Sequence, residues 1–146
     1  MIIWLASYPK SGNTWLRSMI ASYFYTNTGE FNFGLLNNID QFPSFTHFRN
    51  YSDSFEKPES TSKYWLDAQI KINQDKKIKF FKTHNALCTI ENSIFTDQKN
   101  TLGAIYIIRD PRNVINSIFN HFDKKNYQEA LEFMQDEKRC LLHKEN

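Results

Sequence analysis

Short apolar runs alternate along this chain with longer stretches in which apolar residues recur at helical spacing. Three of the runs are five or six residues long and end abruptly in polar residues. Such runs are typical of buried strands, because helices seldom start and stop within so few residues. We therefore predict strands at Ile2–Ala6, Ile78–Lys82 and Gly103–Ile108.

The helical pattern appears in four segments between and after these strands. The predicted helices run from Asn13 to Tyr25, from Thr61 to Asn73, from Pro111 onward with Asp110 as N-cap, and from Asn126 to Leu142. Several side chains are expected to face the core rather than a cofactor. They are Trp15, Leu16, Met19, Ile20, Tyr23 and Phe24 in the first helix, and Ala130, Leu131, Met134 and Leu141 in the last.

Between the first helix and the second, Thr26–Ser60 is rich in Asn, Phe, Ser and Gly and has no clean periodicity. A stretch of this length without regular structure is usually functional, so we expect an acceptor-side or lid segment.

Strands that alternate with helices indicate one α/β domain, spanning 1–146, around a parallel sheet. Ligands of such sheets bind at the carboxyl ends of the strands.

The composition of the chain limits the kinds of molecule that it is expected to bind. The 146 residues are 40% hydrophobic and carry a formal net charge of +2 without a polybasic stretch, which argues against nucleic-acid and membrane partners. Cys88 and Cys140 have no metal-ligand spacing, and free thiols fit a reducing compartment. The opening apolar run is too short for a signal peptide or a membrane span, so a cytoplasmic protein is expected.

A polar cluster follows each predicted strand: Tyr8–Thr14, Lys82–His84 and Arg109–Arg112. One crevice could hold all three. In the first cluster, the turn at Gly12 opens a helix, whose free N–H groups and dipole attract an anion, and Lys10 adds a full charge. The spacing differs from the G-x-x-x-x-G-K-[ST] of nucleotide triphosphatases, which makes ATP hydrolysis a weaker hypothesis.

Arg112 lies in the first turn of a predicted helix, where a cation opposes the helix dipole. Two explanations fit the sequence. A bound phosphate would compensate the charge, or Arg112 is a solvated surface residue beside an ordinary Asp-Pro helix start.

The three clusters together resemble the motifs of sulfotransferases that use 3′-phosphoadenosine 5′-phosphosulfate (PAPS). The stretch Tyr8–Leu16 resembles the 5′-phosphosulfate loop, Phe81–His84 the Lys-Thr-His segment, and Ile105–Ser117 the 3′-phosphate segment. The match runs from about Ile3 to His121. It implies a three-layer P-loop-like fold with a central parallel sheet flanked by helices.

The resemblance also implies roles for individual residues. Lys10 would stabilise the leaving phosphate, Lys82 the sulfuryl oxygens, and His84 would be the general base, with no metal required. The implied donor-binding residues are Lys10, Ser11, Gly12, Asn13, Thr14, Trp15, Arg109 and Ser117. The remaining histidines, His47, His121 and His143, are expected to be structural.

Two departures from the family pattern matter. Asn13 replaces a hydroxyl residue, so one contact to the phosphosulfate would become an amide contact. No Arg-Lys-Gly segment follows, so we expect a C-terminally incomplete domain.

Two alternative functions therefore stay open: a nucleotide-binding module without turnover, and a P-loop kinase-like phosphotransferase. The acceptor would be a small molecule or a carbohydrate, with steroid, sugar, lipid and phenol all open, as is the oligomeric state.

Overall fold

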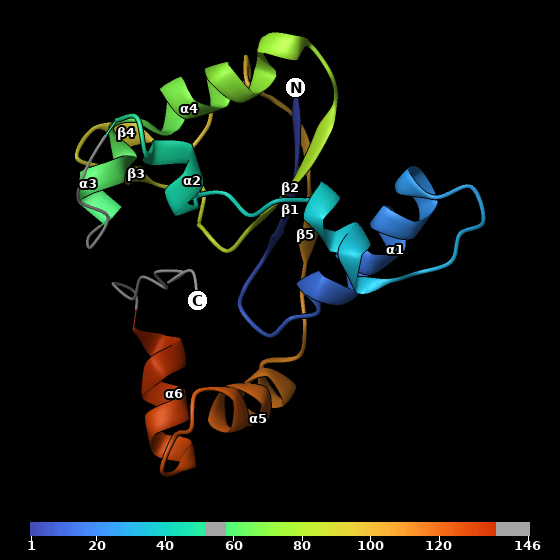
Figure 1. Cartoon of the computed structure of the whole chain (residues 1–146). Helices are drawn as coiled ribbons and strands as arrows, with labels where there is room; N and C mark the ends of the chain where they lie inside the picture. Colours follow the sequence, from blue (N-terminus) through green and yellow to red (C-terminus); the bar gives the residue numbers. More distant parts are fainter. Residues whose placement is uncertain (52–57, 137–146) are drawn as a thin grey trace.

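The computed structural model describes residues 1–51 and 58–136 of the chain. Its centre is a parallel sheet with the strand order β2-β1-β5 (Figure 1). The strands are β1 (Ile2–Ser7), β2 (Lys79–Thr83) and β5 (Thr101–Ile107). All three predicted strands are therefore confirmed, each within two residues of its predicted ends.

Helices and a small hairpin complete the described chain. The α-helices are α1 (Asn13–Tyr25), α2 (Phe45–Phe48), α3 (Pro58–Ser62), α4 (Trp65–Ile72), α5 (Pro111–His121) and α6 (Tyr127–Gln135). The other elements are the 3₁₀ helices η1 (Phe33–Asn38) and η2 (Asn73–Asp75), and the antiparallel pair β3 (Thr89–Ile90) and β4 (Ser93–Ile94).

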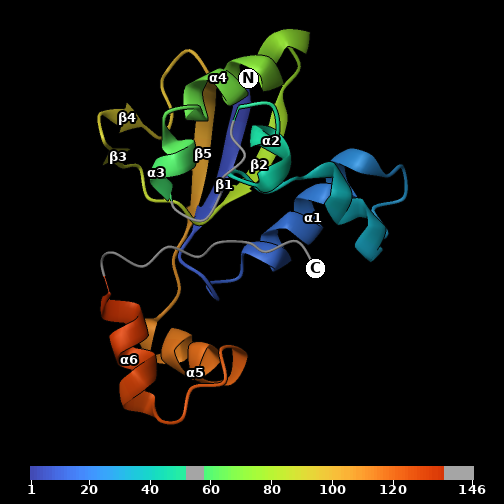
Figure 2. The same ribbon diagram turned by 60° about the vertical axis from the view of Figure 1, so that its left-hand side comes forward.

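The helices form layers on both faces of the sheet, and the two views agree on their arrangement (Figures 1 and 2). Helices α1 and η1 lie on one face, where Leu5, Ala21 and Ile39 form a buried cluster. The elements α2, α3 and α4 lie on the other face, over a larger cluster that includes Trp4 and Phe81. The predicted α/β class, a central parallel sheet flanked by helices, is confirmed.

Helices α5 and α6 pack on each other beyond the carboxyl ends of the strands (Figure 2). Asp110 caps α5 as predicted, because its carboxylate accepts the backbone N–H of Arg112. Helix α6 ends at Gln135, and the rest of the predicted last helix, with Leu141, lies outside the described residues. Leu131 is 37% exposed, so its expected place in the core was wrong, whereas Ala130 is fully buried.

The helix predicted for Thr61–Asn73 is two helices, α3 and α4, separated at Lys63 and Tyr64. Hydroxyl groups explain the break. Thr61 and Ser62 donate their side-chain O–H groups to the carbonyls of Pro58 and Glu59, and such local bonds compete with helix continuation.

The segment Thr26–Ser60 is more regular than its sequence indicates. It contains η1 and α2, and Ile39, Phe42 and Phe48 are almost completely buried, while 52–57 lies outside the described residues. Elements of four to six residues contain at most two helical turns, so they show no recognisable hydrophobic period. The stretch from Ile39 to Phe48 is thus anchored by buried side chains, whereas 27–34 is exposed.

The bounds of α1 were predicted correctly, but its apolar stripe was not. Leu16 and Ile20 pack against the sheet cluster as expected. Trp15, Met19, Tyr23 and Phe24 are 74%, 53%, 78% and 58% exposed, so they are not core residues. A helix lying on a sheet buries only one stripe, and α1 carries apolar side chains around more of its circumference than that.

Candidate functional site

The three polar clusters meet at the carboxyl edge of the sheet because β1 lies between β2 and β5. Two hydrogen bonds connect the clusters. The Nδ1 atom of His84, which follows β2, lies 2.8 Å from the carbonyl oxygen of Ser7 at the end of β1. The guanidinium of Arg109, which follows β5, donates to the carbonyl oxygen of Lys10 at 2.9 Å. The loop after β1 is thus bound to both neighbouring clusters.

Left-handed backbone shapes the loop between β1 and α1. Lys10 has φ 66° and Gly12 has φ 104°, and a positive φ is unfavourable for a residue with a side chain. Among the described residues, no side chain caps the first turn of α1. The first N–H groups of that helix are therefore available to an anion, with the positive end of the helix dipole behind them.

Asn13, the first residue of α1, faces the sheet instead of the loop. Its side-chain amide donates to the carbonyl of Leu5 at 2.8 Å and to the hydroxyl of Ser7 at 3.1 Å, and the residue is 4% exposed. The side-chain amide that the sequence assigns to the phosphosulfate thus donates to the sheet in this structure. The backbone N–H of Asn13 lies in the first turn of α1.

Ser7 links Asn13 to His84, and sequence analysis did not single it out. Its hydroxyl lies 3.1 Å from the Asn13 amide and 3.3 Å from His84 Nδ1. Because a carbonyl oxygen only accepts, the 2.8 Å contact with Ser7 O requires a proton on Nδ1 of His84. In the neutral imidazole this leaves the lone pair on Nε2, which is the form that a proton acceptor needs.

Lys82 lies at the end of β2 with its ammonium group partly withdrawn from water. Its Nζ donates to the Oε1 atom of Gln41 at 2.9 Å. Burial lowers the pKa of Lys82 to about 8, and the positive charge of Arg17 contributes to the same shift. Near neutral pH the ammonium is still charged, so an anion can bind to it.

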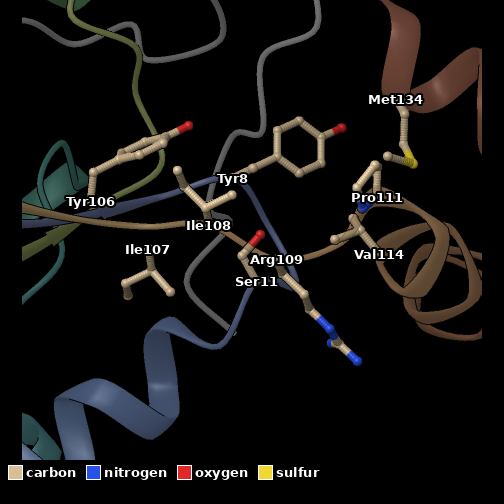
Figure 3. A pocket seen from close by; sticks show the side chains of 9 residues that line it. All are labelled: Tyr8, Ser11, Tyr106, Ile107, Ile108, Arg109, Pro111, Val114 and Met134. Carbon is tan, nitrogen blue, oxygen red and sulfur yellow. The ribbon is translucent and has the colours of Figure 1, made fainter.

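Arg109 borders a hollow of about 270 Å³ between the loop after β1, the end of β5 and the two last helices (Figure 3). The lining residues are Tyr8, Ser11, Tyr106, Ile107, Ile108, Arg109, Pro111, Val114 and Met134. In Figure 3 the Arg109 side chain extends away from the rings of Tyr8 and Tyr106. Ser117, half-buried on α5, does not line this hollow.

The structure decides between the two explanations of Arg112. Its guanidinium binds both carboxylate oxygens of Asp110, with contacts of 2.7 to 3.1 Å. The side chain is 88% exposed, so Arg112 is a surface residue whose charge Asp110 already compensates. A phosphate is not needed to explain it.

The other candidate residues take different places. Trp15, with Met19, Tyr23 and Phe31, lines a second hollow of about 580 Å³ along the outer side of α1. His47 contacts Asp40 at 3.4 Å and packs on the rings of Phe42 and Phe81. Cys88 is a half-buried free thiol, while Cys140 and His143 lie outside the described residues. Within 1–51 and 58–136, no group of three or more His, Cys, Asp or Glu residues could hold a metal ion.

A comparison with known protein families shows the family of the chain. The family model described as "Sulfotransferase domain" matches residues 2–143, which is nearly the whole chain. The chain belongs to this sulfotransferase family. A search of curated proteins finds no match.

Family membership supports sulfuryl transfer as the general activity, and it agrees with the P-loop-like α/β fold of the sheet and its helices. The domain is thus a transferase domain of the sulfotransferase family. Among the described residues of this sulfotransferase domain, no helix is long and apolar enough to cross a membrane.

Proposed function

We propose that this sulfotransferase domain transfers the sulfuryl group of PAPS to a hydroxyl or amine of a small-molecule or carbohydrate acceptor. The observation that carries the proposal is the contact of His84 with Ser7. It sets a histidine of the base-competent tautomer beside the anion-binding loop that begins three residues later. A positioned base and an anion site are the two parts that group transfer to a hydroxyl requires.

The donor would bind along the carboxyl edge of the sheet. The backbone of the loop from Lys10 to Thr14 would hold the 5′-phosphosulfate at the start of α1. Arg109 and Ser117 would hold the 3′-phosphate, and the bond from Arg109 to Lys10 supports a shared site because it joins the two anion-binding segments. The exposed indole of Trp15 would add a flat apolar surface for the adenine of the donor.

In the reaction, the acceptor oxygen or nitrogen forms a bond to sulfur while the bond from sulfur to the 5′-phosphate oxygen breaks. Nε2 of His84 takes the acceptor proton. The ammonium of Lys10 stabilises charge on the leaving phosphate, and the ammonium of Lys82 stabilises the sulfuryl oxygens. Adenosine 3′,5′-bisphosphate and the sulfated acceptor are the products, and most of the catalysis is positioning and electrostatic stabilisation.

Replacing His84 by alanine tests the role of the base. Because the imidazole contacts the acceptor and not the adenosine, His84→Ala should lower turnover by about 10²–10⁴-fold, the usual contribution of general-base assistance. Affinity for adenosine 3′,5′-bisphosphate should stay nearly unchanged. The measurement compares acceptor-dependent turnover with calorimetric nucleotide binding, in a form of the protein with measurable sulfuryl transfer.

His121→Ala is the matched control, because His121 is an exposed histidine in the last turn of α5. It should change neither turnover nor binding. A His84→Ala protein that keeps more than about a tenth of normal turnover would contradict the assignment of the base. Equal binding of ATP and the bisphosphate would instead favour a kinase-like phosphotransferase.

A further inference from the structure

A short strand-like segment, 40–42, lies beside β2 on its outer edge. The backbone N–H of Lys82 donates to the carbonyl of Asp40 at 2.8 Å, and the N–H of Phe42 donates to the carbonyl of Lys82 at 2.9 Å. Gln41 and Lys82 thereby form an isolated parallel bridge. These two bonds fix Gln41 next to Lys82, although 41 positions separate them in the chain.

Buried residues hold this segment in place on both sides of Gln41. Ile39 and Phe42 are both 0% exposed. The guanidinium of Arg17 on α1 donates to the carbonyls of Leu36 and Ile39, at 3.0 and 2.6 Å. The backbone position of Gln41 is therefore determined by packing and hydrogen bonds that do not involve its own side chain.

The alternation of side chains places Gln41 and Lys82 on the same face. Ile39 and Phe80 both pack on the cluster of Leu5 beneath α1. In extended backbone, residues two positions apart share a face, so Gln41 follows Ile39 and Lys82 follows Phe80. The 2.9 Å bond from Lys82 Nζ to Gln41 Oε1 agrees with this geometry.

The hydrogen-bond partner of the Lys82 ammonium is the neutral amide of Gln41, not a carboxylate. Among the described residues, the charge that acts on the Lys82 pKa is that of Arg17 on α1, and the carboxylate in the strand-like segment is that of Asp40, next to Gln41. This carboxylate is engaged by His47 and by the backbone N–H of Gln41. The partner that reaches the ammonium is the uncharged oxygen of Gln41, which accepts a hydrogen bond but cancels no charge.

We propose that Gln41 is a positioning residue that fixes the Lys82 ammonium at the carboxyl edge of the sheet while leaving its charge available to the sulfuryl oxygens. The inference rests on the proposed function, because it gives Lys82 its task in the reaction. A carboxylate in place of the amide would hold the ammonium equally well. It would also compete with the anionic substrate for the same charge.

Two substitutions separate orientation from charge. Gln41→Glu keeps the length of the side chain and should raise the pKa of Lys82 by about one unit or more, because an opposite charge favours the ammonium. Gln41→Ala removes the acceptor and should lower the same pKa, because the buried charge loses its hydrogen bond. Both variants should lower turnover at pH 7 by about tenfold, and the alkaline limb of the pH profile should follow the Lys82 pKa.

The direct readout is the NMR titration of the Lys82 side-chain Cε resonance in the whole chain, assigned by its loss in Lys82→Met. This measurement needs no activity. Asn38→Ala is the control, because the amide of this exposed neighbour contacts Leu35 and not Lys82, and it should leave the Lys82 pKa unchanged. Circular dichroism and thermal unfolding check that each variant is folded, and the length-conserving Gln41→Glu keeps the test decisive if Gln41→Ala is unstable.

The outcomes distinguish this inference from the function on which it rests. Opposite shifts of the Lys82 pKa in Gln41→Glu and Gln41→Ala support the positioning role. The same Lys82 pKa in all folded variants overturns that role, whatever the turnover. Near-normal turnover of Lys82→Ala, in contrast, overturns the proposed part of Lys82 in sulfuryl transfer even where the NMR shifts agree.

Discussion

Asn13 shows how one side chain can tie the start of a helix to the end of a strand. Its amide reaches back from α1 to the carbonyl of Leu5 and the hydroxyl of Ser7, and Ser7 in turn contacts His84. A serine or threonine at this position is too short to make both bonds. The Asn13 side chain is therefore connected through Ser7 to His84, the proposed base.

Asn13→Ala should destabilise the domain by about 1–3 kcal/mol, because it leaves buried acceptors without their donor. Urea unfolding followed by circular dichroism measures the change. The matched control is Asn120→Ala, since the Asn120 amide makes an exposed bond within α5. If both variants lost the same small amount of stability, the structural role of Asn13 would be wrong.

Sequence analysis can select candidate residues at this edge of the sheet, but it cannot predict their contacts. Lys10, His84 and Arg109 could be selected because each follows an apolar run at a spacing that the family shares. The contacts of Ser7 and Gln41 could not be predicted, because they depend on which strands are neighbours. Gln41 in particular lies in a segment without periodicity and meets Lys82 only through the added strand-like segment beside β2.

At the scale of the element, the turn from β1 into α1 forms the proposed anion site. Gly12 has φ 104° and ψ 16°, a conformation that residues with a Cβ adopt at a cost. Space is not the limitation, since a Cβ built at this position meets no atom within 4 Å. The backbone conformation alone requires glycine.

Gly12→Ala should therefore lower the free energy of unfolding by about 1 kcal/mol and weaken binding of the 5′-phosphosulfate end. Gly103→Ala is the matched control, because a Cβ at Gly103 also meets no atom within 4 Å and its φ is not in the left-handed region. Thermal and urea unfolding compare the two. Equal stability of both variants would show that the left-handed turn is not required.

The length and the hydrophobic pattern of an element decide whether the sequence predicts it. Strands β1, β2 and β5 are apolar runs bounded by polar residues, and α1 spans more than three helical turns, so their patterns are clear. Elements η1 and α2 are too short to show a period. The break between α3 and α4 depends on the hydroxyls of Thr61 and Ser62, which a hydrophobic pattern does not register.

At the scale of the whole molecule, the strand order places the loop after β1, which we propose binds the donor anion, between His84, the proposed base, and Arg109. Lys82 lies in β2, His84 follows β2, and Arg109 follows β5. The proposed donor therefore has its reacting end near β2 and its 3′-phosphate near β5. Helices α5 and α6 stand beyond this edge, and Tyr8 of the loop packs against their core.

The central claim is that this arrangement recognises a nucleotide with a 3′-phosphate, and isothermal titration calorimetry tests it most directly. Adenosine 3′,5′-bisphosphate should bind at least about tenfold more tightly than ATP, because a charge-assisted contact from Arg109 contributes on that order. Arg109→Ala should remove the preference, whereas Arg112→Ala should keep it, since Asp110 already pairs with Arg112. Equal or tighter binding of ATP by the unaltered chain would contradict the account.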